Sequence, residues 1–221
     1  MFPNDGDVEA QAINNTGVIA GLDRPFLGSG SVKGWVLQNG TTTTIGALGG
    51  VSSEAFGIND NGQVVGAAET AAPDTIHAFV WQNGAIRDVG SLRGTFSEAV
   101  SINLSGTAVG VATVSGDIGT GDRHAVVFQN GSVTDLTPNL PAPQQSFANW
   151  VNKSGQIVGG SAGAAFIWQN GVGTDLNTLI PAGSGITLTS ADGIDDNGQI
   201  VANGTMAGSN LGETFLLTPR P

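Results

Sequence analysis

One segment of twelve residues recurs at a nearly constant interval along the whole chain. Its clearest copy, at 55–66, has the sequence Ala-Phe-Gly-Ile-Asn-Asp-Asn-Gly-Gln-Val-Val-Gly. Counterparts lie at 10–21, 99–110, 148–159 and 191–202. The turn glycines of successive copies are separated by 45, 44, 49 and 43 residues, and they are Gly17, Gly62, Gly106, Gly155 and Gly198. Five copies of one unit must fold as five similar elements, because each copy contains the same local signals.

Turn signals divide each unit into four short β-strands. In the turn from Asn59 to Gly62, the Asn side chain suits a bond to the main chain two residues on, and the Gly accepts a positive φ. Asn83-Gly84 lies between two apolar runs and favours a type I′ hairpin, because both of its residues need positive φ. The predicted units are approximately 8–53, 54–97, 98–146, 147–189 and 190–221, the last completed by 1–7.

Period-two alternation assigns the side chains of these strands to faces. In the first strand it predicts Ala55 and Gly57 on one face and Ile58 on the other. In the third strand it predicts a bulky pair, such as Phe79 and Trp81, that fills the space between neighbouring sheets. The second strand ends on small residues, which favours this strand as the innermost of each unit. These small residues are Gly21, Gly66, Gly110, Gly159 and Ala202.

The repeat predicts an all-β fold, a five-bladed β-propeller with four short antiparallel strands per blade, in a single domain over 1–221. Four strands in roughly 40 to 45 residues are typical of a propeller blade. An open β-solenoid is the alternative, but it has shorter repeats and exposed sheet edges. The fifth unit ends at Leu217-Thr218-Pro219 without a fourth strand. We therefore expect residues 1–8 to pair with the strand at 214–218 and close the ring.

Composition excludes several classes of function. Lys and Arg number 7 against 18 Asp and Glu, and the net charge of −11 disfavours nucleic acid and anionic membranes as partners. The absence of cysteine excludes disulfides and thiolate metal sites, and two histidines cannot build a His-rich zinc centre. No apolar run approaches the roughly 18 residues of a membrane-spanning helix. We expect no membrane insertion, no metal and no cofactor.

The segment His77-Ala-Phe-Val-Trp-Gln-Asn-Gly84, flanked by the Ala-x-x-Ile-Asn-x-x-Gly-x-Val-Val-Gly units, resembles the HAF repeat of extracellular bacterial proteins. The ending Phe215 to Pro221 is similar to the point at which such proteins run into a PEP-CTERM sorting tail. The resemblance implies secretion or display at a bacterial surface, with signal and sorting segments outside this sequence, and it implies no enzymatic role. This sequence departs from the motif because only two units keep its histidine, as His77 and His124.

The two histidines are candidate ligand-binding residues, because they precede the third strand in adjacent units. No serine and no third metal ligand recurs beside them, so a hydrogen-bonded structural histidine is the alternative for both. Three aspartates also recur at one position, and we expect them to accept main-chain bonds near a turn. They are Asp88, Asp135 and Asp175.

Asp192 and Glu213 are the carboxylates that break the repeat pattern at strand positions, and both fall in the fifth unit. Together they form the candidate catalytic pair of a glycan-active hydrolase, which needs two carboxylates about 5 to 10 Å apart. The segment 192–198 is superficially like a calcium loop, because it gathers several oxygen ligands. It occurs five times with Asn in place of Asp195, so an Asn-stabilised turn is the preferred interpretation.

Trp150 stands where the other units have Ala12, Gly57, Ser101 and Gly193, whereas Trp35, Trp81 and Trp168 occupy expected core positions. An indole at a crowded place either plugs the central channel or offers a stacking surface for a sugar. The connections between second and third strands vary in length, which favours them as recognition loops. They span 22–32, 68–76, 113–123 and 161–163.

These observations predict a non-enzymatic, extracellular bacterial module that binds carbohydrate or protein at the cell surface, or that serves as a structural domain. Two alternatives remain open. One is the hydrolase built on Asp192 and Glu213. The other is a scaffold that assembles with itself through the incomplete fifth unit.

Overall fold

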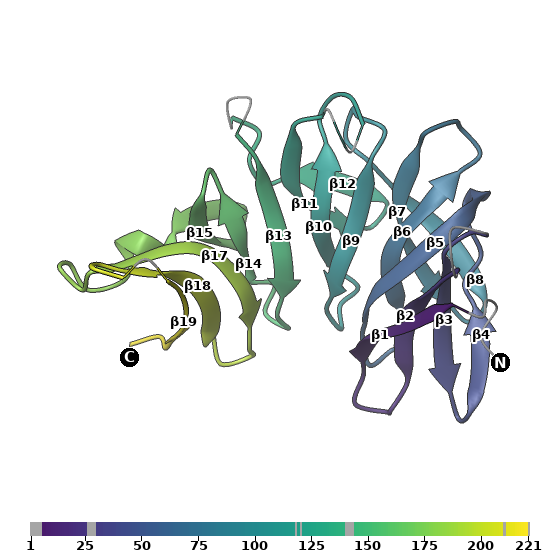
Figure 1. The fold of residues 1–221 in the computed structure, drawn as a ribbon, viewed down its shortest axis with the longest axis horizontal. Coiled ribbons are helices and arrows are strands. Elements are labelled where there is room, and N and C mark those ends of the chain that lie inside the picture. Colours follow the sequence, from purple (N-terminus) through teal and green to yellow (C-terminus); the bar gives the residue numbers. More distant parts are fainter. Residues whose placement is uncertain are drawn as a thin grey trace.

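The computed structural model describes residues 6–25, 30–117, 119, 121–139, 144–209 and 211–220. They form five antiparallel sheets that follow one another in chain order, with the N-terminal and C-terminal sheets at opposite ends of the molecule (Figure 1). The prediction of an all-β fold in five repeated units is confirmed. The one helical element among the described residues is the short 3₁₀ turn η2 (Leu176–Thr178), and no helix there is long and apolar enough to cross a membrane.

Each sheet is an up-and-down meander of consecutive strands. Sheet 1 consists of β1 (Asp7–Ile13), β2 (Ile19–Arg24), β3 (Lys33–Gln38) and β4 (Thr41–Thr44). Sheet 2 consists of β5 (Gly49–Ile58), β6 (Val64–Thr70), β7 (Ile76–Gln82) and β8 (Ala85–Gly90). Sheet 3 consists of β9 (Ser97–Ile102), β10 (Ala108–Thr113), β11 (Arg123–Gln129) and β12 (Ser132–Asp135). Sheet 4 consists of β13 (Ser146–Val151), β14 (Ile157–Ser161), β15 (Ala164–Gln169) and β16 (Val172–Asp175). Sheet 5 consists of β17 (Ile186–Ile194), β18 (Ile200–Met206) and β19 (Gly212–Leu217).

The turns form as their residues predict. Asn83 and Gly84 have φ values of 51° and 86°, and the equivalent Asn-Gly pairs of sheets 1, 3 and 4 adopt the same conformation. In the other hairpin, Asn59 Oδ1 accepts the main-chain N–H groups of Asn61 and Gln63 at 3.1 and 3.0 Å. Both hairpins therefore depend on residues within the turn itself, and these residues can be recognised in the sequence.

The first strand of every sheet contains a β-bulge that changes which residues share a face. The pairing skips one residue, so that Ala55 pairs with Gly66 while Gly57 pairs with Val65. The predicted alternation in the first strand is therefore wrong, because a bulge adds one residue and inverts the faces beyond it. Ala55 and Ile58 pack together against the preceding sheet, and Gly57 faces the following one. The five bulge residues are Gln11, Phe56, Val100, Asn149 and Asp192.

The bulge also explains the glycines on the second strand. A Cβ at Gly110 would lie 2.0 Å from the main-chain oxygen of Glu98 on the bulged strand, and Gly66 faces Glu54 in the same way. The prediction that the second strand is innermost is wrong. The first strands of neighbouring sheets pack against one another instead, and all five line one shared groove.

Buried apolar side chains of the described residues gather in four clusters, one at each junction between neighbouring sheets. At the junction of sheets 3 and 4, Val109 of sheet 3 is directed toward sheet 4, and Trp168 of sheet 4 is directed toward sheet 3. Trp35, Trp81 and Trp168 are 2%, 8% and 1% exposed, which confirms them as core residues.

The predicted closure of the ring is not found in the described residues. Asp7 and Val8 belong to β1 and pair with Arg24 and Asp23, and β1 is an edge strand whose partner in the described structure is β2 and not β19. Residues 1–5 lie outside the described part. Within that part, β19 pairs with β18 alone, and no extensive packing joins sheet 5 to sheet 1. The reason is physical: a repeat specifies each sheet and its contact with the next, but not the angle between sheets that decides whether five units close a circle.

Candidate functional site

A central groove of about 1010 Å³ runs along the first strands of all five sheets. Its walls are the bulged ends of β1, β5, β9, β13 and β17, the turns that follow them and, in sheet 5, also Val201 of β18 and Leu216 of β19. Among the lining residues that the structure describes, none belongs to the variable connections between second and third strands. The described residues of the predicted recognition loops therefore lie outside this groove, and residues 26–29, 118 and 120 of these loops lie outside the described part.

The bulges give the groove its varied chemistry. A bulge turns a side chain out of the regular alternation, and none of the five bulge residues is fully buried. Gln11, Phe56, Val100 and Asp192 line the groove, so that an amide, a phenyl ring, an isopropyl group and a carboxylate occupy equivalent places. The repeated residues specify the strands and turns, whereas the residue at the bulge position differs from sheet to sheet.

Trp150 is the largest side chain exposed in the groove. It directly follows the bulge residue of β13, and 48% of its surface is exposed. Asn149, the bulge residue itself, donates from Nδ2 to the carbonyl of Ala191 at 2.9 Å and so ties β13 to β17. The structure thus places the indole on the groove wall with about half of its surface exposed.

A ladder of asparagine side chains joins the turns at one end of the groove. Asn59 donates from Nδ2 to the carbonyl of Asn103, 2.9 Å away in the next sheet. The same bond runs from Asn14 to Asn59, from Asn103 to Asn152, and from Asn152 to Asp195, each at 3.0 Å. Each Asn therefore has two roles, because its Oδ1 stabilises its own turn while its Nδ2 holds the adjacent sheet. All four lie buried.

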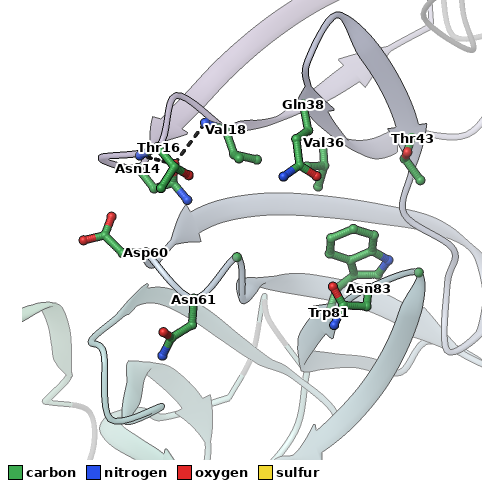
Figure 2. A pocket seen from close by; sticks show the side chains of 12 residues that line it. Asn14, Thr16, Val18, Val36, Gln38, Thr43, Asp60, Asn61, Trp81 and Asn83 are labelled. Carbon is green, nitrogen blue, oxygen red and sulfur yellow. Dashed lines mark hydrogen bonds between the residues drawn. The ribbon is translucent and has the colours of Figure 1, made fainter.

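A smaller cleft of about 420 Å³ lies between sheets 1 and 2 near these turns. Figure 2 shows Trp81 and Asn83 on one side of it, opposite Gln38 and Val36 of sheet 1. Trp81 contributes little accessible surface there because it is 8% exposed. The cleft is thus a gap between two packed sheets and has no exposed aromatic platform like that of the central groove.

The predicted catalytic carboxylates do not converge. Asp192 lines the groove, and its carboxylate accepts from Asn203 Nδ2 and, at 3.3 Å, from Ser190 Oγ. Asn203 also accepts a bond from Thr214 Oγ1, so Asp192 lies on the Thr214 face of sheet 5. Glu213 is adjacent to Thr214 on β19 and therefore points to the opposite face. The two carboxyl groups cannot share one substrate from opposite faces of a sheet.

Each histidine is paired with one of the recurring aspartates. His124 Nδ1 lies 2.8 Å from Asp135 Oδ2, and His77 Nδ1 lies 2.9 Å from Asp88 Oδ2. The aspartates also accept the main-chain N–H two residues on, as expected of them: Asp88 accepts from Gly90 at 2.7 Å. Neither histidine lines the central groove. The pairs join the third and fourth strands of sheets 2 and 3, a structural role for both histidines.

Asp195 replaces the ladder asparagine in sheet 5. Its Oδ1 accepts the N–H groups of Gln199 and Asn197 at 2.7 and 2.9 Å. The bond from Gln199 contributes most to lowering the pKa of this carboxyl below its ordinary value. The segment that superficially suggested calcium therefore forms the turn found in the other sheets. In the described part of the chain, no three His, Asp or Glu side chains lie close enough together to hold a metal ion.

Sequence reasoning missed two features of the site. The bulges leave a trace in the sequence, because the least repeated residue of the first strand always stands directly after the invariant alanine: Gln11, Phe56, Val100, Asn149 and Asp192. The ladder leaves a trace in the Asn of each turn, but a turn explains that Asn completely. The bond to the next sheet is visible only once the sheets are placed side by side.

Comparison with known proteins supports the fold alone. No protein-family model matches the sequence, and no curated protein is significantly similar to it. Among solved structures, the chain is similar to the acylaminoacyl peptidase of Pyrococcus horikoshii, with a TM-score of 0.56 and 10% identity. The match covers 96% of this chain and 37% of that one. The likeness concerns the arrangement of the sheets, and the chain spans little more than a third of that enzyme's length.

Proposed function

We propose that the chain is a five-bladed β-propeller arc that acts as a non-enzymatic, extracellular binding module for carbohydrate. The order of the sheets and their inner first strands support the propeller. The resemblance of the segment 77–84 to the HAF repeat supports an extracellular bacterial origin. The observation that carries the binding role is Trp150, an indole 48% exposed in a groove where equivalent positions hold small residues.

The surroundings of Trp150 suit a sugar. Indole stacks on the apolar face of a pyranose ring, while hydroxyl groups need donors and acceptors close by. Gln11, Lys153 and Asp192 line the same groove, and Phe56 and Val100 extend its apolar part. A groove shared by five sheets suits an extended oligosaccharide better than a single sugar.

Screening soluble linear oligosaccharides of glucose, galactose, mannose and N-acetylglucosamine on an array, followed by calorimetry, tests this proposal. We expect binding that changes tryptophan fluorescence, because Trp150 is the exposed indole among the four. Trp150→Ala is expected to weaken the binding about tenfold, and Trp150→Phe to retain most of it.

Phe147→Ala is the matched control. Phe147 lies on the same strand, is 38% exposed and does not line the groove, so its loss should leave sugar affinity unchanged. Equal affinities for Trp150→Ala and the original chain would reject the stacking role. If no sugar binds, the carbohydrate proposal fails, and a protein ligand or a structural role takes its place.

A further inference from the structure

The two end sheets expose apolar side chains at positions that are covered elsewhere. The forward face of a sheet is the face toward the next sheet in chain order, and the back face is the one toward the preceding sheet. On the forward face of sheet 5, Val201 is 42% exposed and Leu216 is 65% exposed. The residues equivalent to Val201 in the other sheets are fully buried, because the next sheet covers them: Ala20, Val65, Val109 and Val158. A Cβ at Gly193, also on this face, would meet nothing within 4 Å, whereas one at Gly57 would touch the adjacent sheet.

The back face of sheet 1 shows the complementary pattern. Ile13 is 67% exposed there, whereas the equivalent Ile102 and Ile194 are 8% and 4% exposed because a preceding sheet covers them. Val8, in the same strand, is 39% exposed. Sheets 1 and 5 therefore expose the two halves of an interface that is formed four times between the described sheets.

The same two faces lack the polar links that join the internal sheets. Ser97 Oγ accepts the N–H of Ala78 at 2.9 Å and donates to the carbonyl of Gly90, and Ser53 and Ser146 accept the equivalent bonds. In sheet 1 this position is Val8, which has no hydroxyl group. The carbonyl of Asn14 accepts Gly17 N–H of its own turn and, within the described chain, no side-chain amide.

At the other end of the ladder, Asp195 of sheet 5 occupies the position from which an asparagine would donate to a following sheet. Its carboxylate has no N–H to donate, and it would face a main-chain oxygen in a sixth sheet. In addition, Asn203 and Thr214 make the outer part of the forward face of sheet 5 polar, although they bond to each other. The exposed faces of sheets 1 and 5 thus keep the apolar residues of an internal junction, but they lack the groups that form its hydrogen bonds.

We propose that the forward face of sheet 5 docks onto the back face of sheet 1 of a second copy of this chain, in a head-to-tail association that Asp195 keeps weak and reversible. The occupant is a second copy because sheet 1 carries the surface that sheets 2 to 5 present at each internal junction. The chain's own sheet 1 makes no extensive contact with sheet 5. A head-to-tail contact joins different surfaces, so further copies can add.

Sedimentation equilibrium from about 1 μM to about 1 mM tests this proposal. The mean mass is expected to rise reversibly with concentration. Asp195→Asn supplies the missing amide and removes the charge, so it should tighten association about tenfold. Leu216→Asp and Ile13→Asp should each abolish it. Val172→Asp is the matched control, because Val172 is 66% exposed on β16, away from both faces.

Mixing two variants distinguishes head-to-tail docking from other contacts. Leu216→Asp keeps an intact sheet 1, and Ile13→Asp keeps an intact sheet 5, so an equimolar mixture should form a dimer that cannot grow. A mixture that stays at the mass of one chain overturns the proposal. So does a single-chain mass for both the original protein and Asp195→Asn at all concentrations. A rise in melting temperature without a change in mass for Asp195→Asn also overturns it, because the chain's own sheet 1 is then the occupant.

Discussion

Asn59 Nδ2 lies 2.9 Å from the main-chain oxygen of Asn103, its counterpart one repeat later, and this bond connects residues 44 positions apart in the sequence. Because each turn asparagine holds the next, an error in one turn affects two sheets. The ladder thus couples neighbouring repeats through buried polar side chains.

The ladder predicts a difference between two substitutions of Asn103. Asn103→Asp keeps the oxygen that accepts Ser105 and Thr107 N–H groups, but it loses the bond to Asn152 and should cost about 1–3 kcal/mol of unfolding free energy. Asn103→Ala should cost more, because it also leaves turn N–H groups without an acceptor. Urea denaturation measures both. Equal stabilities for Asn103→Asp and the original chain would mean that the inter-sheet bond contributes nothing.

Gly110 is predicted to tolerate no side chain. A methyl group there would lie 2.0 Å from the oxygen of Glu98, and relief requires the bulge to move, so Gly110→Ala should cost at least about 3 kcal/mol. Sheet 5 provides the control, since Ala202 occupies the equivalent position and Ala202→Gly should cost only about 1 kcal/mol. Thermal denaturation compares the two, and similar small losses would contradict the steric role of the bulge.

Glu98 predicts a pH dependence of stability. Burial raises the pKa of this carboxyl, and Arg123 offsets part of that effect. The folded chain then holds the proton more tightly than the unfolded chain does, so Glu98 costs stability once the pH exceeds its ordinary pKa of 4.5. Glu98→Gln should therefore be more stable than the original at pH 7, and this gain should vanish as the pH falls below 4.5. Urea titrations at both pH values measure it. Lower stability of Glu98→Gln at pH 7 would show that attraction to Arg123 outweighs burial.

The sequence predicts those features that one repeat contains by itself. Asn83-Gly84 and Asn59 specify their turns through local conformation and hydrogen bonds. Phe79 and Trp81, as bulky apolar residues in alternate positions, indicate a packed face of their strand. Features that require two repeats to be placed in space are not predicted. Whether a further sheet packs beyond Asp195 depends on small angles between sheets. The bulge at Phe56 lies within one repeat, but its only signal is that this position varies among the five copies. The exposed indole of Trp150 is predicted in part. Its departure from the repeat is visible in the sequence, but the groove around it is not.

The bulge has a consequence for how such a protein changes over time. Several positions of the inner strands and their turns must satisfy a neighbour, by size as at Gly57 or by bonding as at Asn59. The bulge residues Gln11, Phe56 and Val100 instead face the groove and are not fully buried. Mutation can exchange these residues without unfolding the molecule, so one framework can vary the chemistry of its groove while the strands and turns stay the same.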